Sequence, residues 1–268
     1  MTKRRWNLRD MPGPPGSVVT FDLTSWERPT ATTIIGIVCA VARFAHAGHT
    51  LRIVWPRSNY ALRLLSTVEL VEALETFASV RGSRAEGRVQ RHHPIIPVTN
   101  IKAARDVDEL GANVEEEFTA SGRFAANLLG DVYICMTEAA NNVVQHSRSP
   151  VGGFAMAQGR YFKAFGELRP YIEIAVGDPG VGIAESLGIA SDREAIAEAM
   201  KEGVSSTATA NRGLGLYVIE AAAKNGLHRF VALHSGEGHV IRGSSVEATD
   251  REVGCTSGGT WLTVLLPY

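Results

Sequence analysis

The sequence predicts an α/β protein built from two units, and three observations lead to this prediction. Strand-like and helix-like segments alternate through the first 80 residues, which is typical of a small α/β unit. Residues 81–93 then interrupt the apolar periodicity with four arginines, two glycines and a single acid. Charge divides near the same place, because residues 1–100 carry 13 Lys/Arg and 7 Asp/Glu whereas residues 101–268 carry 14 and 21.

Composition narrows the class of protein further. The 268 residues are 45% hydrophobic and 7% aromatic, which is enough for a sizeable core and excludes a disordered chain or a coiled-coil rod. Cys39, Cys135 and Cys255 have neither the number nor the spacing of a disulfide framework or a zinc site, which is typical of the reducing cytosol. The most apolar segment, Ile34–Ala42, is far shorter than the roughly 20 residues that cross a bilayer. We therefore expect a cytoplasmic protein with no membrane partner.

The first unit is expected to begin after a flexible leader, residues 1–16, which is rich in charge, Pro and Gly. A β-branched run, Val18–Thr24, predicts a strand. The apolar segment Ala31–Ala47 predicts a buried helix, with Thr30 as its N-cap and Gly48 as its stop.

The rest of this unit, expected over residues 17–80, adds a second strand and a second helix. Leu51–Trp55 is an apolar run closed by a proline, and Tyr60–Ser79 repeats apolar residues at three- and four-residue spacing. Residues 81–94 are then expected to be an arginine-rich linker; a contact with an anion or with nucleic acid is the alternative for this segment.

The second unit is expected over residues 95–268. It contains one long helical region, from Asp106 to about Ser147, with a break near Ser121-Gly122 or Gly130. A further helix starts at Leu216. Strands are expected at 95–101, 153–159, 171–176, 228–234, 239–242 and 261–266.

Polar residues repeat along the predicted helix that ends near Ser147. Glu138, Asn142 and His146 recur every four residues, beside the apolar stripe of that helix. An amide oxygen can bind a hard cation, and a carboxylate one turn away can orient or deprotonate a nucleophile. The same stripe also fits the solvent-exposed side of an amphipathic helix, so both interpretations stay open at this point.

Three glycine-containing motifs follow. Asp178 ends an apolar strand before Gly180 and Gly182, which predicts a tight turn with one fixed acceptor. Gly213 and Gly215 open a helix, where exposed N–H groups favour phosphate. Their spacing lacks the third glycine of a dinucleotide-binding fold. Thr260 follows two glycines at the start of the last strand.

The order and spacing of these four motifs resemble the N, G1, G2 and GT boxes of the GHKL (histidine-kinase-like) ATPase superfamily. The resemblance implies a Bergerat fold, an α/β sandwich in which a mixed sheet carries helices on one face and binds ATP with Mg²⁺. It implies that Glu138 is the catalytic general base, Asn142 the magnesium ligand and Asp178 the acid that binds the adenine amine, with Gly180 and Gly182 in the adjoining turn.

The resemblance also implies a phosphate-binding segment and a lid. The phosphate-side residues are Arg212, Gly213, Leu214, Gly215 and Leu216. Thr260 would lie near the adenine-binding acid. The segment Ala184–Arg212, with Lys201 and a run of small hydroxyl residues, would be a flexible lid over the nucleotide.

Residues 17–80 resemble a STAS-like domain, the fold of anti-sigma antagonists, by their order of strands and helices. The phosphorylation motif usual in such domains is absent, and Thr32 or Thr33 takes its place in the alignment of elements.

Together the resemblances predict a bacterial cytosolic ATP-binding regulator similar to anti-sigma-factor serine kinases. Its partner would be a protein such as an anti-sigma antagonist or a sigma-factor-like regulator, and a homodimer is an allowed state. The alternatives are a non-catalytic, ATP-gated interaction module and an atypical histidine kinase, while nucleic acid is not expected as a partner. Opposite net charges of the two halves also predict a contact between them that salt loosens.

Overall fold

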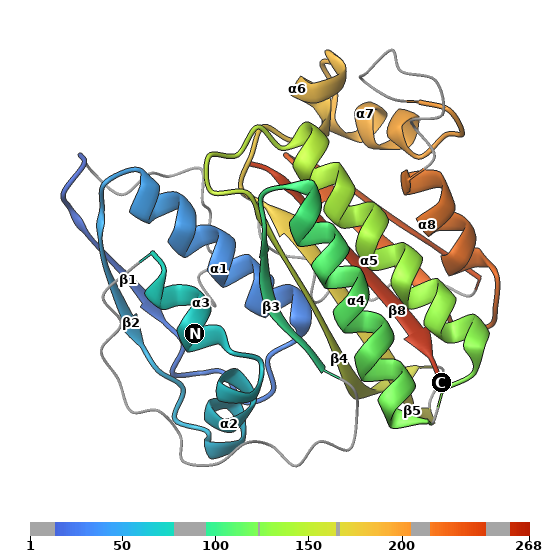
Figure 1. The fold of residues 1–268 in the computed structure, drawn as a ribbon. Coiled ribbons are helices and arrows are strands. Elements are labelled where there is room, and N and C mark those ends of the chain that lie inside the picture. Colours follow the sequence, from blue (N-terminus) through green and yellow to red (C-terminus); the bar gives the residue numbers. More distant parts are fainter. Residues whose placement is uncertain (1–13, 78–94, 123, 165–166, 205–214, 245–257) are drawn as a thin grey trace.

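Helices pack on both faces of a six-stranded sheet in the computed structural model, which describes residues 14–77, 95–122, 124–164, 167–204, 215–244 and 258–268 (Figure 1). The strand order is β3-β4-β5-β8-β6-β7. The strands are β3 (Ile95–Ile101), β4 (Gly153–Ala164), β5 (Glu167–Asp178), β6 (Phe230–Ser235), β7 (Gly238–Gly243) and β8 (Thr260–Pro267).

Every neighbouring pair of strands in this sheet is antiparallel, so the expectation of a mixed sheet is wrong. Two hairpins, β4–β5 and β6–β7, supply four of the strands. β5 and β6 run in the same direction, and a mixed sheet would result if they were neighbours. The last strand, β8, lies between them instead and pairs antiparallel with both.

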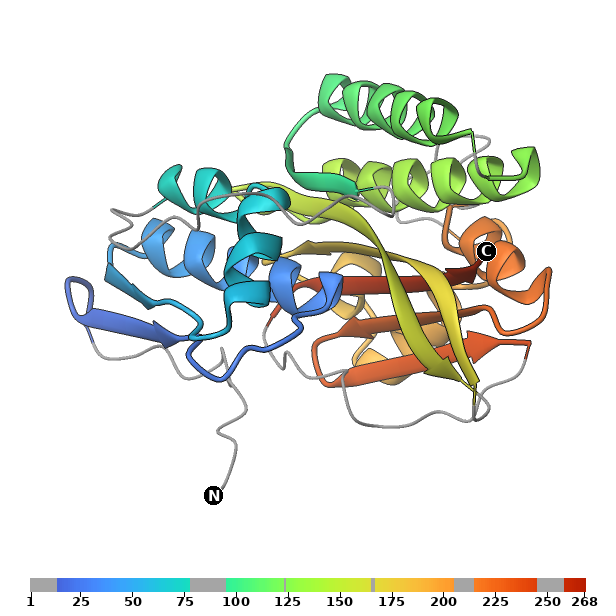
Figure 2. The ribbon, with the colours of Figure 1, turned by 90° about the horizontal axis from the view of Figure 1, so that it is seen from below.

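Three helices of the second unit cover one face of the sheet, called the front face below. They are α4 (Ala104–Ser121), α5 (Ala126–His146) and α8 (Gly215–Lys224). Figure 2 shows α5 next to the sheet and α4 outside it. The predicted break between α4 and α5 is confirmed at Gly122, whose φ of 59° ends α4 in the left-handed region. The predicted apolar stripe of α5 is buried in the front core: Leu128, Val132, Cys135, Ala139 and Val143.

The N-terminal unit forms a small parallel sheet of two strands, β1 (Val18–Asp22) and β2 (Thr50–Val54), joined by α1 (Ala31–His46). The predicted ends of α1 are confirmed. Thr30 accepts a hydrogen bond from the backbone N–H of Thr33, and Gly48 follows the helix with a φ of 80°.

The single helix predicted over Tyr60–Ser79 is wrong. The structure has two short helices here, α2 (Asn59–Thr67) and α3 (Leu70–Glu75). The chain breaks at Glu69, which has a φ of 57°. The preceding residue accounts for this break. The carbonyl of Val68 does not bond within a helix but accepts a hydrogen bond from the N–H of Val98 on β3, at 3.0 Å.

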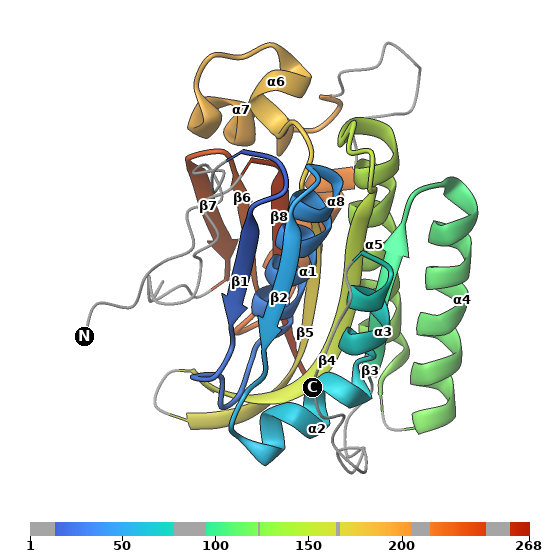
Figure 3. The same cartoon turned by 90° about the vertical axis from the view of Figure 1, so that its left-hand side faces the viewer.

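Helix α1 lies between the two-stranded sheet and the back face of the six-stranded sheet (Figure 3). Its buried side chains share one apolar cluster with residues of β4, β5 and β8, among them Phe154, Ala175 and Trp261. The helices of the second unit therefore do cover one face, but the opposite face is covered by the N-terminal unit. The described contact between the two units is mainly apolar. The opposite net charges of the two halves predict an electrostatic contact instead, which salt would weaken.

A buried polar cluster fixes the start of α1 on this face. One oxygen of Glu173 on β5, a residue only 4% exposed, accepts hydrogen bonds from the N–H of Ala31, the amide of Gln158 and the guanidinium of Arg160, at 3.0, 2.9 and 3.2 Å. The carboxylate thus satisfies a free N–H at a helix N-terminus, where negative charge is favoured. Thr32 contacts Thr263 of β8 through their hydroxyls at 2.7 Å.

Two further helices, α6 (Ile183–Leu187) and α7 (Asp192–Ala199), lie at the end of the sheet where β5 ends (Figure 1). No helix in the described part of the chain has the length and apolar content needed to cross a membrane.

Candidate functional site

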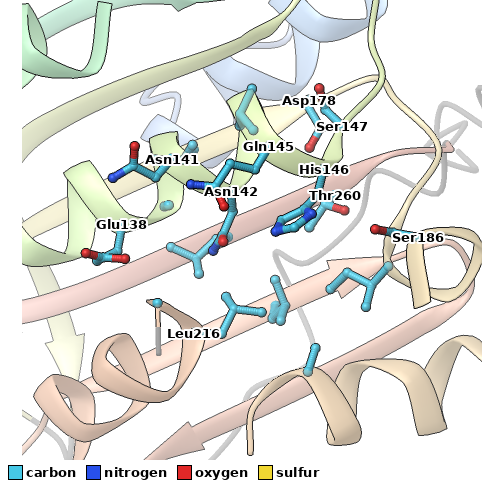
Figure 4. A pocket seen from close by; sticks show the side chains of 18 of the residues that line it. Glu138, Asn141, Asn142, Gln145, His146, Ser147, Asp178, Ser186, Leu216 and Thr260 are labelled. Carbon is cyan, nitrogen blue, oxygen red and sulfur yellow. The ribbon is translucent and has the colours of Figure 1, made fainter. Parts of the chain in front are cut away.

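A cavity of about 450 Å³ opens between α5, the ends of the central strands, α6 and the start of α8 (Figure 4). This volume lies within the range of small-molecule sites in proteins. Its lining combines apolar side chains with a few polar ones, which is typical of a site for a ligand of mixed chemistry.

Three polar side chains lie in register at the strand ends that border the cavity. Asp178 of β5 pairs with Thr260 of β8, and Thr260 pairs with Ser235 of β6. Directly opposed residues share a face of an antiparallel sheet, and alternation places these three on the front face, toward α5. The next row inward on that face is apolar and forms the floor of the cavity: Val176, Leu262 and Leu233.

Asp178 is a buried carboxyl, 5% exposed. The described residues supply one hydrogen bond to it, from the N–H of Gly180 to Oδ1 at 2.8 Å. Burial raises its pKa from the ordinary 3.8 to about 7, and the Gly180 N–H offsets this only in part. A ligand N–H group that donates to this carboxylate would stabilise its charged form, so the site favours an amine at this place.

The turn after Asp178 needs its two glycines for different reasons. A Cβ atom at Gly180 would lie 1.9 Å from the carbonyl oxygen of Ser147, which leaves no room for any side chain. Gly182 has a φ of 83°, a conformation that disfavours other residues, and a Cβ there would lie 2.9 Å from Oγ of Ser235. The sequence predicted a tight turn here, and the close backbone contacts confirm it.

The polar stripe of α5 forms the opposite wall, because Glu138, Asn142 and His146 all line the cavity (Figure 4). Of the two interpretations of this stripe, the structure supports a site rather than a solvent-exposed surface. Nδ2 of Asn142 is buried and has no hydrogen-bond partner among the residues that the structure describes. A buried amide without a partner costs free energy, and a ligand in the cavity would remove that cost.

The start of α8 approaches this wall closely. A Cβ atom at Gly215 would lie 2.9 Å from Oε2 of Glu138 and 3.5 Å from Oδ1 of Asn142. The absence of a side chain at Gly215 therefore leaves space beside a carboxylate, an amide oxygen and a helix N-terminus. These groups suit an anion together with a cation. No cluster of three or more His, Cys, Asp or Glu side chains in the described ranges could hold a metal by itself.

The described part of the predicted lid is more ordered than expected for a flexible loop. It contains α7 and all of α6 except its first residue, and it adds to the cavity wall the residues Ser186, Leu187, Ala199 and Val204. Lys201 pairs with Glu198, one turn earlier, with Nζ 2.5 Å from the carboxylate. The run of hydroxyl residues at 205–210 lies outside the described residues.

Most of the predicted site residues meet at this cavity. Those that line it are Glu138, Asn142, Asp178, Gly182, Gly215, Leu216 and Thr260. Gly180 lies beside the cavity and binds Asp178. The predicted phosphate-side residues Arg212, Gly213 and Leu214 lie outside the described residues.

Sequence reasoning missed Ser186, Gln145 and the apolar floor, which line the cavity, and Ser235, which contacts Ile183 and Thr260. Alternation along three predicted strands could have placed Val176, Leu233 and Leu262 on inward faces. No sequence signal showed that these faces would adjoin, because strand order is decided by packing.

Comparison with known proteins leaves the family open. No protein-family model matches the chain, and a search of curated proteins finds no match either. The motifs and the geometry of the cavity are therefore the observations from which a function can be proposed.

Proposed function

We propose that the cavity binds Mg·ATP and that the protein is a regulator of the GHKL type with a Bergerat fold, which phosphorylates a serine or threonine of a partner protein or switches that partner through ATP hydrolysis. The observation that carries this proposal is the meeting of Glu138, Asn142, Asp178 and Thr260 around one cavity of nucleotide size. These residues come from three motifs that are up to about 120 residues apart in the sequence.

The two ends of the cavity fit the two ends of ATP. The buried acid Asp178 and the apolar floor would hold the adenine, with its amine donating to the carboxylate. Phosphates would lie at the other end, near Gly215 and the start of α8, where N–H groups at a helix N-terminus favour negative charge.

The residues near Gly215 also fit a magnesium ion bound together with phosphate. Mg²⁺ commonly takes only one or two protein oxygens and completes its shell with phosphate and water. Asn142 would hold the ion through its amide oxygen. The bound ion would supply neutralisation of the charge that develops on the phosphates.

Glu138 lies on α5 one turn before Asn142 and lines the same wall. Its carboxylate would orient a water molecule or a hydroxyl of the partner protein and take its proton as the oxygen attacks the terminal phosphate. The bond between that phosphate and the bridging oxygen would break, and ADP would leave with the electron pair. The N-terminal unit, which we take to be STAS-like, would then serve as the surface that docks the partner.

Turnover of labelled Mg·ATP by the wild type and by Glu138→Ala tests this function. We expect binding by both proteins, and a loss of phosphate release or transfer of at least about 100-fold in the variant. Glu116→Ala, which removes an exposed carboxylate of α4, is the matched control and should keep full turnover.

Three results would change the proposal. Absence of ATP binding by the wild type would refute it. ATP binding without any turnover would favour the alternative of a non-catalytic, ATP-gated interaction module. Phosphate transfer to a histidine would favour an atypical histidine kinase.

A further inference from the structure

Ser235 connects the start of the lid with the start of the last strand through one hydroxyl group. It is fully buried, with 0% of its surface exposed. Its Oγ accepts a hydrogen bond from the N–H of Ile183, the first residue of α6, at 2.8 Å. The same hydroxyl donates to the carbonyl of Gly259, just before β8, at 3.2 Å. A residue outside all four sequence motifs thus holds two of them together.

The hydrogen-bond capacity of Ser235 determines the direction of a third contact, to Thr260. Oγ of Ser235 lies 3.4 Å from Oγ1 of Thr260, and either hydroxyl has the chemistry to donate. The carbonyl of Gly259 can only accept, so the single proton of Ser235 goes to it. Ser235 can then meet Thr260 only as an acceptor, so a hydrogen bond between the two hydroxyls uses the proton of Thr260 and leaves its oxygen as an acceptor for a ligand in the cavity that Thr260 lines.

We propose that Ser235 is a positioning residue that makes Thr260 an acceptor beside Asp178 and thereby favours adenine over guanine at the base-binding end of the cavity. This inference rests on the proposed binding of ATP. Ser235 acts through Thr260 and through Ile183 at the base of the lid.

The base chemistry follows from the direction of these hydrogen bonds. Adenine carries an amine at its six-position, which donates, whereas guanine carries a carbonyl oxygen there, which accepts. In the proposed pose the six-position of the base faces Asp178 and Thr260, which both offer acceptors. An amine at that position is satisfied and a carbonyl oxygen there is repelled, whereas the N–H donors of guanine lie at other positions of its ring. Without Ser235, the Thr260 hydroxyl could rotate and donate to guanine instead.

Calorimetric titration with Mg·ATP, Mg·GTP and adenosine tests this role. The variants are Ser235→Ala, Thr260→Val and the double variant. Ser244→Ala is the matched control, because it removes a serine hydroxyl bonded to the carbonyl of Gly226, beyond the far end of the β6–β7 hairpin. Circular dichroism and thermal unfolding show whether each variant is folded.

We expect Ser235→Ala to weaken the binding of ATP and of adenosine by the same factor, about tenfold, because the two ligands share the base and the substitution lies at the base-binding end of the cavity. Affinity for GTP should not fall, so the preference for ATP over GTP should narrow by about tenfold. Thr260→Val should weaken ATP to a similar extent. The double variant should lose little more than either single variant, because both changes break one connection. Ser244→Ala should bind like the wild type.

Two outcomes would overturn the inference while leaving ATP binding intact: a Ser235→Ala protein with unchanged base preference, or a double variant whose loss is the product of the single losses. If Ser235→Ala does not fold, Ser235→Cys keeps the size and a weak donor and should give an intermediate base preference. An unchanged preference in Ser235→Cys would then count against the inference. A wild-type protein that binds no ATP would refute the proposed function itself.

Discussion

Replacing Asp178 with asparagine should stabilise the folded protein above neutral pH, although it removes a residue of the proposed site. The folded protein holds the Asp178 proton more tightly than the unfolded chain does, because burial raises the pKa from 3.8 to about 7. Stability from this group is therefore fully present below pH 3.8 and is lost as pH rises through 7. A difference of roughly three pKa units corresponds to about 4 kcal/mol.

Asparagine does not ionise and can still accept the Gly180 N–H through its amide oxygen. The free energy of unfolding of Asp178→Asn should therefore exceed that of the wild type by up to about 4 kcal/mol at pH 8, and by little at pH 4. Urea unfolding at both pH values measures the difference. Asp108→Asn, on the exposed side of α4, is the control and should differ from the wild type by less than about 0.5 kcal/mol.

The affinity for ATP should also change with the ionisation of Asp178. Only about one tenth of Asp178 would be ionised at pH 6, so wild-type affinity should be about tenfold weaker there than at pH 8. His146 also lines the cavity, and His146→Gln should keep this slope if Asp178 is responsible. Equal stability of Asp178→Asn and wild type at pH 8, or a stability difference that does not change with pH, would refute the reasoning.

Three further predictions concern the phosphate end and the packing of α1. Gly215→Ala should weaken the binding of Mg·ATP about tenfold in calorimetry, because the new Cβ would displace the carboxylate of Glu138. The Tm should change little, because the displaced atom is the end of a flexible side chain. Glu173→Ala should lower the free energy of urea unfolding by about 3 kcal/mol, because it leaves the buried amide of Gln158, the N–H of Ala31 and the partly buried guanidinium of Arg160 without their shared partner. Glu167→Ala, at an exposed ion pair, should cost less than about 1 kcal/mol. Ile35→Ala should lower the free energy of urea unfolding by about 2–5 kcal/mol, because Ile35 lies in the apolar contact between the two units. Since this contact is mainly apolar, 1 M NaCl should not separate the units.

Local features of this protein were predictable from neighbouring residues. The ends of α1 follow from a threonine that can cap and a glycine that can adopt a positive φ, and both lie next to the helix in sequence. The shared face of Glu138 and Asn142 follows from helical spacing. The break at Glu69 was missed, because its cause is a hydrogen bond between Val68 and Val98, far apart in the sequence.

Sequence by itself thus determined most of the helices and strands, the turns that need glycine, and which polar residues share a face, since these depend on backbone preferences and on periods of two or four residues. Only the tertiary structure decided that β8 lies between β5 and β6, that Ser235 meets Thr260, and that α1 covers the back of the sheet. These features depend on which apolar faces exclude water together and which buried polar groups find partners. That choice is made by the whole chain and not by any one segment.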